Sequence, residues 1–176
     1  GRDASYIPEY VSVGSAVGKN FLLHTDDFSQ LAWTRPNVTI TQAAVANPIN
    51  GLVNAQKVEA TTSTNTTFYQ DAESSGLSSG NIFVVYVKQG SGATDANLFI
   101  VRNNTSATNI LGFSFNYSTG AITYSTGSTG ASAVALPNGW WKLQMVVTSG
   151  ISNGNTLRLY IGYTGLPETA GEHLYV

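Results

Sequence analysis

Several features that are common in globular proteins are scarce or missing in this sequence of 176 residues. It has no cysteine, which excludes a disulfide framework and thiolate metal sites but says nothing about compartment. No apolar stretch approaches the roughly 20 residues that span a bilayer, and the N-terminus lacks the basic and then apolar order of a signal peptide. The sequence therefore predicts a domain without membrane insertion, held together by its core alone.

Charged residues are also few. They make up 10% of the chain, with eight bases and ten acids that give a formal net charge of −2. The charges are spread without runs, so no stretch of sequence forms a positive track for a nucleic-acid backbone or an anionic membrane. The composition predicts no nucleic-acid partner and disfavours polyanions as ligands.

Short β-branched and aromatic runs are abundant, and clusters of Gly, Asn, Ser and Pro separate them. Helical periodicity is hard to find, and the short connections favour antiparallel hairpins over parallel units with crossover helices. With 42% hydrophobic residues, the chain is able to bury one core. We expect an all-β sandwich whose strands cover residues 20–25, 37–44, 55–61, 67–72, 81–89, 97–103, 110–117, 121–125, 139–148, 156–163 and 173–176.

Several expected strands alternate apolar with polar residues, so every second side chain faces the core. Leu111, Phe113, Phe115 and Tyr117 form one inward set, and Trp141 to Val147 contains another. The residues that we assign to the core are Trp33, Phe83, Phe113, Phe115, Leu143, Met145, Leu159 and Ile161.

The opposite, outward sets carry the most useful functional signal. Sugar rings stack on Trp or Tyr, while neighbouring amide, guanidinium or ammonium groups donate hydrogen bonds to their hydroxyls. Three expected strands supply that chemistry, so we predict a carbohydrate-binding face. The alternative is an ordinary wet sheet face, or one covered by an N-terminal arm. The outward residues are Tyr86, Lys88, Trp140, Lys142, Gln144, Arg158 and Tyr160.

Signals for catalysis are weak. His24 and His173 lie in expected strands without a nucleophile or acid at a recognised spacing, and the acids near turns form no obvious pair. The sequence therefore predicts no enzyme and no required cofactor. Asp26 and Asp27 offer hard oxygen ligands for a structural calcium ion, and the alternative reading of these adjacent acids is a turn at a strand end.

Residues 20–33, NFLLHTDDFSQLAW, resemble the N-L-L-x-x-S-E-D-F-S-x-x-x-W opening of a domain found in many phage tail and tail-fibre proteins. Residues 3–14, DASYIPEYVSVG, separately resemble a short phage-tail segment that often precedes such domains. Further segments follow in the order of that domain: NAQKVEAT at 54–61, FYQ at 68–70, NIFVVYVKQG at 81–90, NGWWKLQMVVT at 138–148, LRLYIGYTG at 157–165 and GEHLYV at 171–176.

The resemblance implies a jelly-roll β-sandwich of two antiparallel sheets over residues 19–176, preceded by an arm or linker over residues 1–18. It also implies a non-catalytic carbohydrate-binding module of an extracellular virion tail. Its partners would be a polysaccharide or cell-surface glycan and other tail subunits. The main alternative is a purely structural tail-fibre module for assembly or trimerisation, and a polysaccharide-degrading enzyme is the third option.

Overall fold

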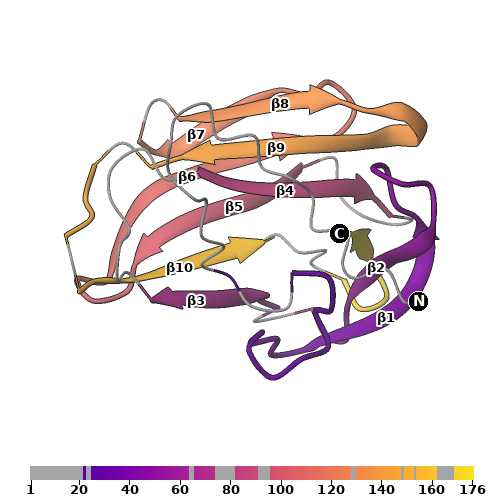
Figure 1. The fold of residues 1–176 in the computed structure, drawn as a ribbon, viewed down its shortest axis with the longest axis horizontal. Helices are drawn as coiled ribbons and strands as arrows, with labels where there is room; N and C mark the ends of the chain where they lie inside the picture. Colours follow the sequence, from indigo (N-terminus) through magenta and orange to yellow (C-terminus); the bar gives the residue numbers. More distant parts are fainter. Residues whose placement is uncertain are drawn as a thin grey trace, which may run out of the picture.

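The computed structural model describes residues 22, 25–63, 66–73, 82–90, 96–127, 130–147, 149–152, 154–161 and 169–176. The expected arm over residues 1–18 lies outside them. No helix in these ranges is long and apolar enough to cross a membrane. The strands are β1 (Val38–Ala46), β2 (Val53–Ala60), β3 (Tyr69–Glu73), β4 (Ile82–Gln89), β5 (Ala96–Asn103), β6 (Thr108–Asn116), β7 (Ile122–Thr126), β8 (Ala131–Ala135), β9 (Trp140–Val146), β10 (Thr156–Ile161) and β11 (His173–Tyr175), as Figure 1 shows.

These strands form a six-stranded sheet, in the order β1-β2-β11-β4-β9-β8, and a five-stranded sheet, in the order β3-β10-β5-β6-β7 (Figure 1). Every pairing is antiparallel. The chain alternates between the sheets from β2 to β5 and again from β9 to β11. Two interlocking sets of four strands result, β2-β11-β4-β9 and β3-β10-β5-β6, which is the strand order of a jelly roll. The predicted fold class is confirmed.

The core lies between the two sheets and is built from the inward set of each strand. Val87 and Leu143 of the six-stranded sheet are fully buried, as are Phe99 and Phe113 of the five-stranded sheet. Full burial of such side chains stabilises the fold by about 1.5–3 kcal/mol each. All eight residues that the sequence assigns to the core belong to this cluster, so that prediction is confirmed.

Ten of the eleven expected strands correspond to observed ones within a few residues. The expected strand over residues 20–25 falls mostly outside the described residues. The sequence analysis missed β8, whose residues ASAVA include three alanines. Alanine has low strand propensity, and β8 forms here as an edge strand paired with β9. This strand therefore forms because it pairs with β9, and the local sequence pattern does not reveal that pairing.

Candidate functional site

Five of the seven predicted binding residues lie on the outer face of the six-stranded sheet. Tyr86 and Lys88 of β4 stand opposite Lys142 and Trp140 of β9, respectively, and Gln144 follows on the same strand. Residues paired across antiparallel strands share a face, and so do residues two apart along one strand. The alternation in β4 and β9 thus predicted the side of these residues correctly.

The last strand extends this face with an aromatic side chain. Tyr175 of β11 pairs with Lys57 of β2 on one side and with Lys88 of β4 on the other. His173 lies two residues earlier, and its Nε2 is 3.2 Å from the Tyr175 hydroxyl. We call this surface the lysine face and define it by Lys57, Glu59, Tyr86, Lys88, Lys142, Gln144, His173 and Tyr175, all of them partly buried.

The prediction that Arg158 and Tyr160 join these residues is wrong. Both lie in β10, which pairs with β3 and β5 in the five-stranded sheet, so they are on the opposite outer face of the sandwich. Alternation along a strand shows which residues share a side, but it does not show which sheet the strand joins. The connection from β9 to β10 crosses between the sheets and separates the two groups.

The donors of Arg158 are engaged within the protein. Its Nε and Nη2 donate to the two carboxylate oxygens of Asp71 at 2.6 and 2.8 Å, and its guanidinium lies 4.0 Å from the centre of the Tyr69 ring. The hydrogen bonds to Asp71 raise the pKa of Arg158 above its usual value. Arg158 therefore holds β10 against β3 and is not arranged as a ligand donor.

Two expected stacking platforms are buried. Tyr160 is 5% exposed and Trp140 is 2% exposed, although both point away from the core between the sheets. Neither presents an open ring to solvent, so the expectation of exposed platforms at these two positions is wrong. The pattern gave the direction of each side chain but not what packs against it.

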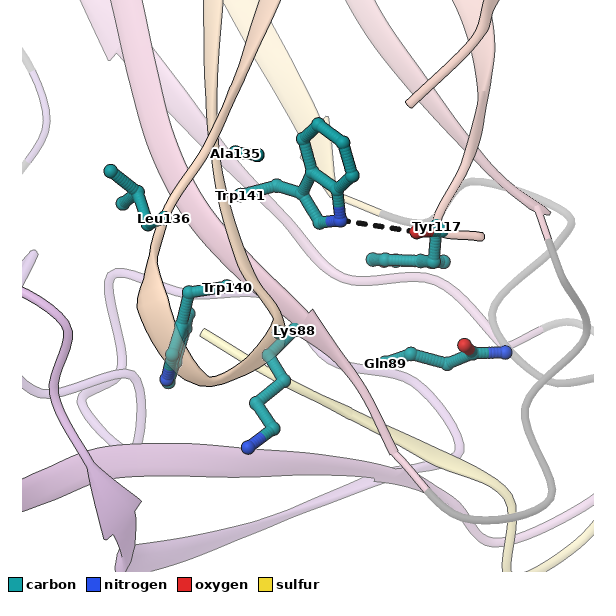
Figure 2. Close-up of a pocket in the computed structure, with 8 residues that line it drawn as sticks. Lys88, Gln89, Tyr117, Ala135, Leu136, Trp140 and Trp141 are labelled. Carbon is teal, nitrogen blue, oxygen red and sulfur yellow. Dashed lines mark hydrogen bonds between the residues drawn. The ribbon is translucent and has the colours of Figure 1, made fainter. Parts of the chain in front are cut away.

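A pocket of about 340 Å³ adjoins the lysine face where β4 ends and β9 begins. That volume lies at the lower end of the range for small-molecule sites. Trp140 and Trp141 leave the strand on opposite sides, and Figure 2 shows the Trp141 indole beside Tyr117. The lining residues are Lys88, Gln89, Tyr117, Ala135, Leu136, Gly139, Trp140 and Trp141, and we call this hollow the tryptophan pocket.

The turn between β8 and β9 shapes this pocket. Its sequence LPNG bends the chain through left-handed backbone at Asn138 and Gly139, with φ of 61° and 77°. The turn closes with a hydrogen bond of 2.8 Å from the Leu136 amide to the Trp140 carbonyl oxygen. Trp141 Nε1 donates to the Tyr117 carbonyl oxygen at 3.1 Å, which fixes the indole at the edge of the sandwich (Figure 2).

Two tyrosine hydroxyls near this surface and the pocket keep their protons. Burial raises the pKa of Tyr86 and of Tyr117, so both hydroxyls stay protonated at neutral pH. The Tyr117 hydroxyl is buried and has no hydrogen-bond partner within the described part of the chain. A buried hydroxyl left unpaired costs about 1–3 kcal/mol. A ligand hydroxyl or a water molecule that reached it would remove this cost.

A second hollow, of about 290 Å³, lies beside the start of β6, whereas the tryptophan pocket lies just beyond the end of that strand. Its lining contains no aromatic side chain. The residues are Asn103, Ser106, Thr108, Asn109, Ile110, Ser149 and Gly150. Of these two hollows, the tryptophan pocket is therefore the one that offers rings on which a sugar could stack.

The acids proposed for calcium lie in a hydrogen-bonded turn. The Asp27 carboxylate accepts hydrogen bonds from the hydroxyl of Ser29 and the side-chain amides of Gln30 and Gln42. These bonds, those from Gln30 and Ser29 above all, hold the pKa of Asp27 well below its usual range. Calcium needs six or more oxygen ligands, whereas nitrogen donors face this carboxylate. As arranged, the Asp27 carboxylate does not fit a calcium ion, and a site that involves Asp26 stays a prediction.

A thermal melt tests the calcium prediction. We expect millimolar calcium to leave the melting midpoint unchanged, because both amides would have to turn before their oxygens faced an ion. A ligand that binds only the folded state raises the midpoint by mass action. A rise that a chelator reverses, and that Asp27→Asn abolishes, would instead establish the site.

Comparisons with known proteins assign no family and give two distant structural alignments. No protein-family model and no curated protein matches the chain. The CBM22-1 xylan-binding domain of Paenibacillus barcinonensis Xyn10C aligns at 18% identity over 85% of this chain and 84% of its own, with a TM-score of 0.43. The arabinose-bound α-L-arabinofuranosidase MgGH51 aligns at 12% identity over 82% of this chain but 22% of its own, with a TM-score of 0.42.

Sequence reasoning missed much of this surface. Lys57 and Glu59 follow the alternation of β2, and His173 and Tyr175 that of β11, so their side was readable from the pattern. Nothing in the sequence placed these two strands beside β4. Tyr117 and Trp141 were assigned inward. They line the tryptophan pocket at the edge of the sandwich, since Tyr117 directly follows β6 and Trp141 is the second residue of β9.

Proposed function

We propose that this domain is a non-catalytic carbohydrate-binding module, and that the lysine face and the tryptophan pocket form its binding site. One observation carries the proposal: tyrosine rings and amine or amide groups alternate on one continuous surface, which opens into a pocket with a tryptophan wall. Tyr86 stands opposite Lys142, and Tyr175 stands beside Lys88. Sugars need this combination of stacking surface and hydrogen-bond donors.

The roles of the residues follow from their positions. Tyr86 and Tyr175 offer half-buried rings. Trp141 takes the stacking role that the sequence analysis gave to Trp140 and Tyr160. Lys88 belongs to both the lysine face and the tryptophan pocket, so one ligand could contact both. The proposed hydrogen-bond donors to sugar hydroxyls are Lys88, Gln89, Lys142 and Gln144.

We further propose that the domain belongs to a phage tail protein, on the strength of the ordered sequence segments that resemble tail domains. Weak binding by single domains would gain strength from repeated copies in a virion. The alternative is a structural module of the tail fibre, in which the lysine face would contact another subunit. Reducing-end release from polysaccharides, which we expect to be absent, tests the enzymatic option.

Affinity electrophoresis through gels that contain different polysaccharides tests glycan binding. We expect at least one polymer to retard the protein, and Tyr86→Ala to weaken that binding by about 1–3 kcal/mol, by analogy with stacking of bases on aromatic side chains. Tyr69→Ala is the matched control, because Tyr69 is a partly buried tyrosine on the opposite outer face.

The outcomes separate the two functions. No retardation by any polymer would favour the structural module. Equal retardation of the wild type and the Tyr86→Ala variant, with weakened binding in the Tyr69→Ala variant, would move the site to the five-stranded sheet.

A further inference from the structure

Three of the chain's four lysines lie on the lysine face, although they are far apart in the sequence. Lys57, Lys88 and Lys142 come from β2, β4 and β9, and the strand register brings them together. Glu59 is the one acid among the residues that define this face. The chain has eight Lys and Arg residues and a net charge of −2, and three of those eight bases meet on this one face.

Two of these lysines have no acidic partner in the described residues. Lys57 Nζ is bound to Glu59 at 2.5 Å, and the other ion pair of those residues joins Arg158 to Asp71 on the opposite face. Lys88 and Lys142 are diagonal neighbours on adjacent strands, because Lys88 stands opposite Trp140 and Lys142 lies two residues further along β9. Diagonal neighbours are about 7–8 Å apart, a separation that two long lysine side chains can span to contact one anion.

Unpaired cations held side by side on a partly buried surface repel each other, and a bound carboxylate would relieve that repulsion. Tyrosine rings flank the pair on both sides: Tyr86 is opposite Lys142, and Tyr175 is opposite Lys88. The surface thus offers stacking for the ring of a sugar and two ammonium groups for an acid attached to it.

We propose that the glycan recognised by the lysine face is an acidic polysaccharide, whose sugar carboxylates lie between Lys88 and Lys142. The proposal rests on the proposed function and specifies the ligand class of the same site. The sequence disfavoured polyanions because its charges form no runs. In the folded domain, however, the strand register places three lysines from distant parts of the sequence on one face.

The probes are polygalacturonate, alginate and hyaluronan, each paired with its carboxyl-reduced, neutral derivative in affinity electrophoresis. We expect at least one acidic polymer to bind about tenfold more tightly than its reduced form, with a preference that weakens as salt is raised. Lys88→Gln and Lys142→Gln should each lower the affinity for the acidic form about tenfold, as expected for loss of a charge-assisted hydrogen bond. Thr123→Glu, an exposed change on the five-stranded sheet, lowers the net charge equally and should leave binding unchanged.

Each other outcome overturns the inference in a recognisable way. Equal binding of acidic and reduced polymers would refute the charge preference while leaving glycan binding intact. Binding to neutral polymers of the wider panel but to none of the acidic probes would likewise refute the charge preference and leave glycan binding intact. Failure to bind any polysaccharide would refute the proposed function as well. Equal retardation by duplex DNA would show an unselective anion surface and would also refute the inference.

Discussion

Replacement of Tyr160 by alanine is expected to lower the free energy of unfolding by about 3–5 kcal/mol, the range for truncation of a large buried aromatic side chain. Tyr160 is 5% exposed and stands in register with Tyr69 and with Ile100, which is 3% exposed. Its ring centre lies 5.0 Å from that of Tyr69, and its hydroxyl accepts a hydrogen bond of 3.3 Å from Arg158. The truncation would leave a cavity beneath these side chains.

Urea denaturation followed by tyrosine and tryptophan fluorescence measures this loss. Tyr160→Phe is the control, because it keeps the ring and removes one hydrogen bond, which is worth about 0.5–1.5 kcal/mol. Binding to any polysaccharide by the folded fraction of Tyr160→Ala should be unchanged. A loss of stability below about 1 kcal/mol, accompanied by weaker glycan binding, would show that Tyr160 is an exposed platform after all.

Replacement of Asn103 by aspartate is expected to cost about 3–5 kcal/mol at pH 7, because it buries an unpaired charge. Asn103 is 5% exposed at the end of β5. Its Nδ2 donates to the Gly150 carbonyl oxygen and to Asn155 Oδ1, each at 3.0 Å. Its Oδ1 accepts from the amides of Thr105 and Ser106. In the aspartate variant, a negatively charged oxygen would take the place of Nδ2 and would face the Gly150 carbonyl oxygen and Asn155 Oδ1 without a hydrogen bond.

The pH dependence of this variant has a definite sign. Burial and the two facing oxygens favour the protonated form of the introduced carboxyl group, so its pKa in the folded state lies above the ordinary value of about 3.9. The stability deficit relative to wild type is then largest at pH 7 and shrinks as the pH falls toward 4. The matched control is Asn104→Asp. Asn104 is half-buried, and its side chain has no such hydrogen-bond network within the described residues, so this change should cost less than about 0.5 kcal/mol.

Urea denaturation at pH 7 and pH 4 decides between the two variants. Equal losses in Asn103→Asp and Asn104→Asp would mean that Asn103 does not connect the turn after β5 to residues 150–155.

The strands were predictable where side-chain alternation is regular. In β6, the inward set of Leu111, Phe113 and Phe115 gives both the strand and its buried face. The same signal was too weak in β8, where alanine and serine carry little sidedness. The jelly-roll class came from the resemblance to tail domains and not from the pattern. The order of the strands was not predicted, because no local signal says which strand crosses to the other sheet.

In the candidate site too, the sequence predicted the side on which residues lie but not which strands are neighbours. Tyr86, Lys88 and Lys142 were predicted on one outward surface and do share it, since β4 and β9 are neighbours. Arg158 has the same outward pattern but belongs to the other sheet. Lys57 and Tyr175 were missed because their strands reach the surface through long-range pairing alone. Periodicity determines the side of a strand, and register determines which residues meet.

Mapping of amide chemical shifts during a titration tests the central claim most directly. The ligand is an oligosaccharide of whichever polymer retards the protein most strongly, added to the isotope-labelled wild type. The account predicts that the perturbed amides cluster in β4, β9 and β11, with further shifts at Tyr117 and at residues 136–141. Perturbations confined to β3, β10 and β5, or to the hollow beside the start of β6, would contradict it.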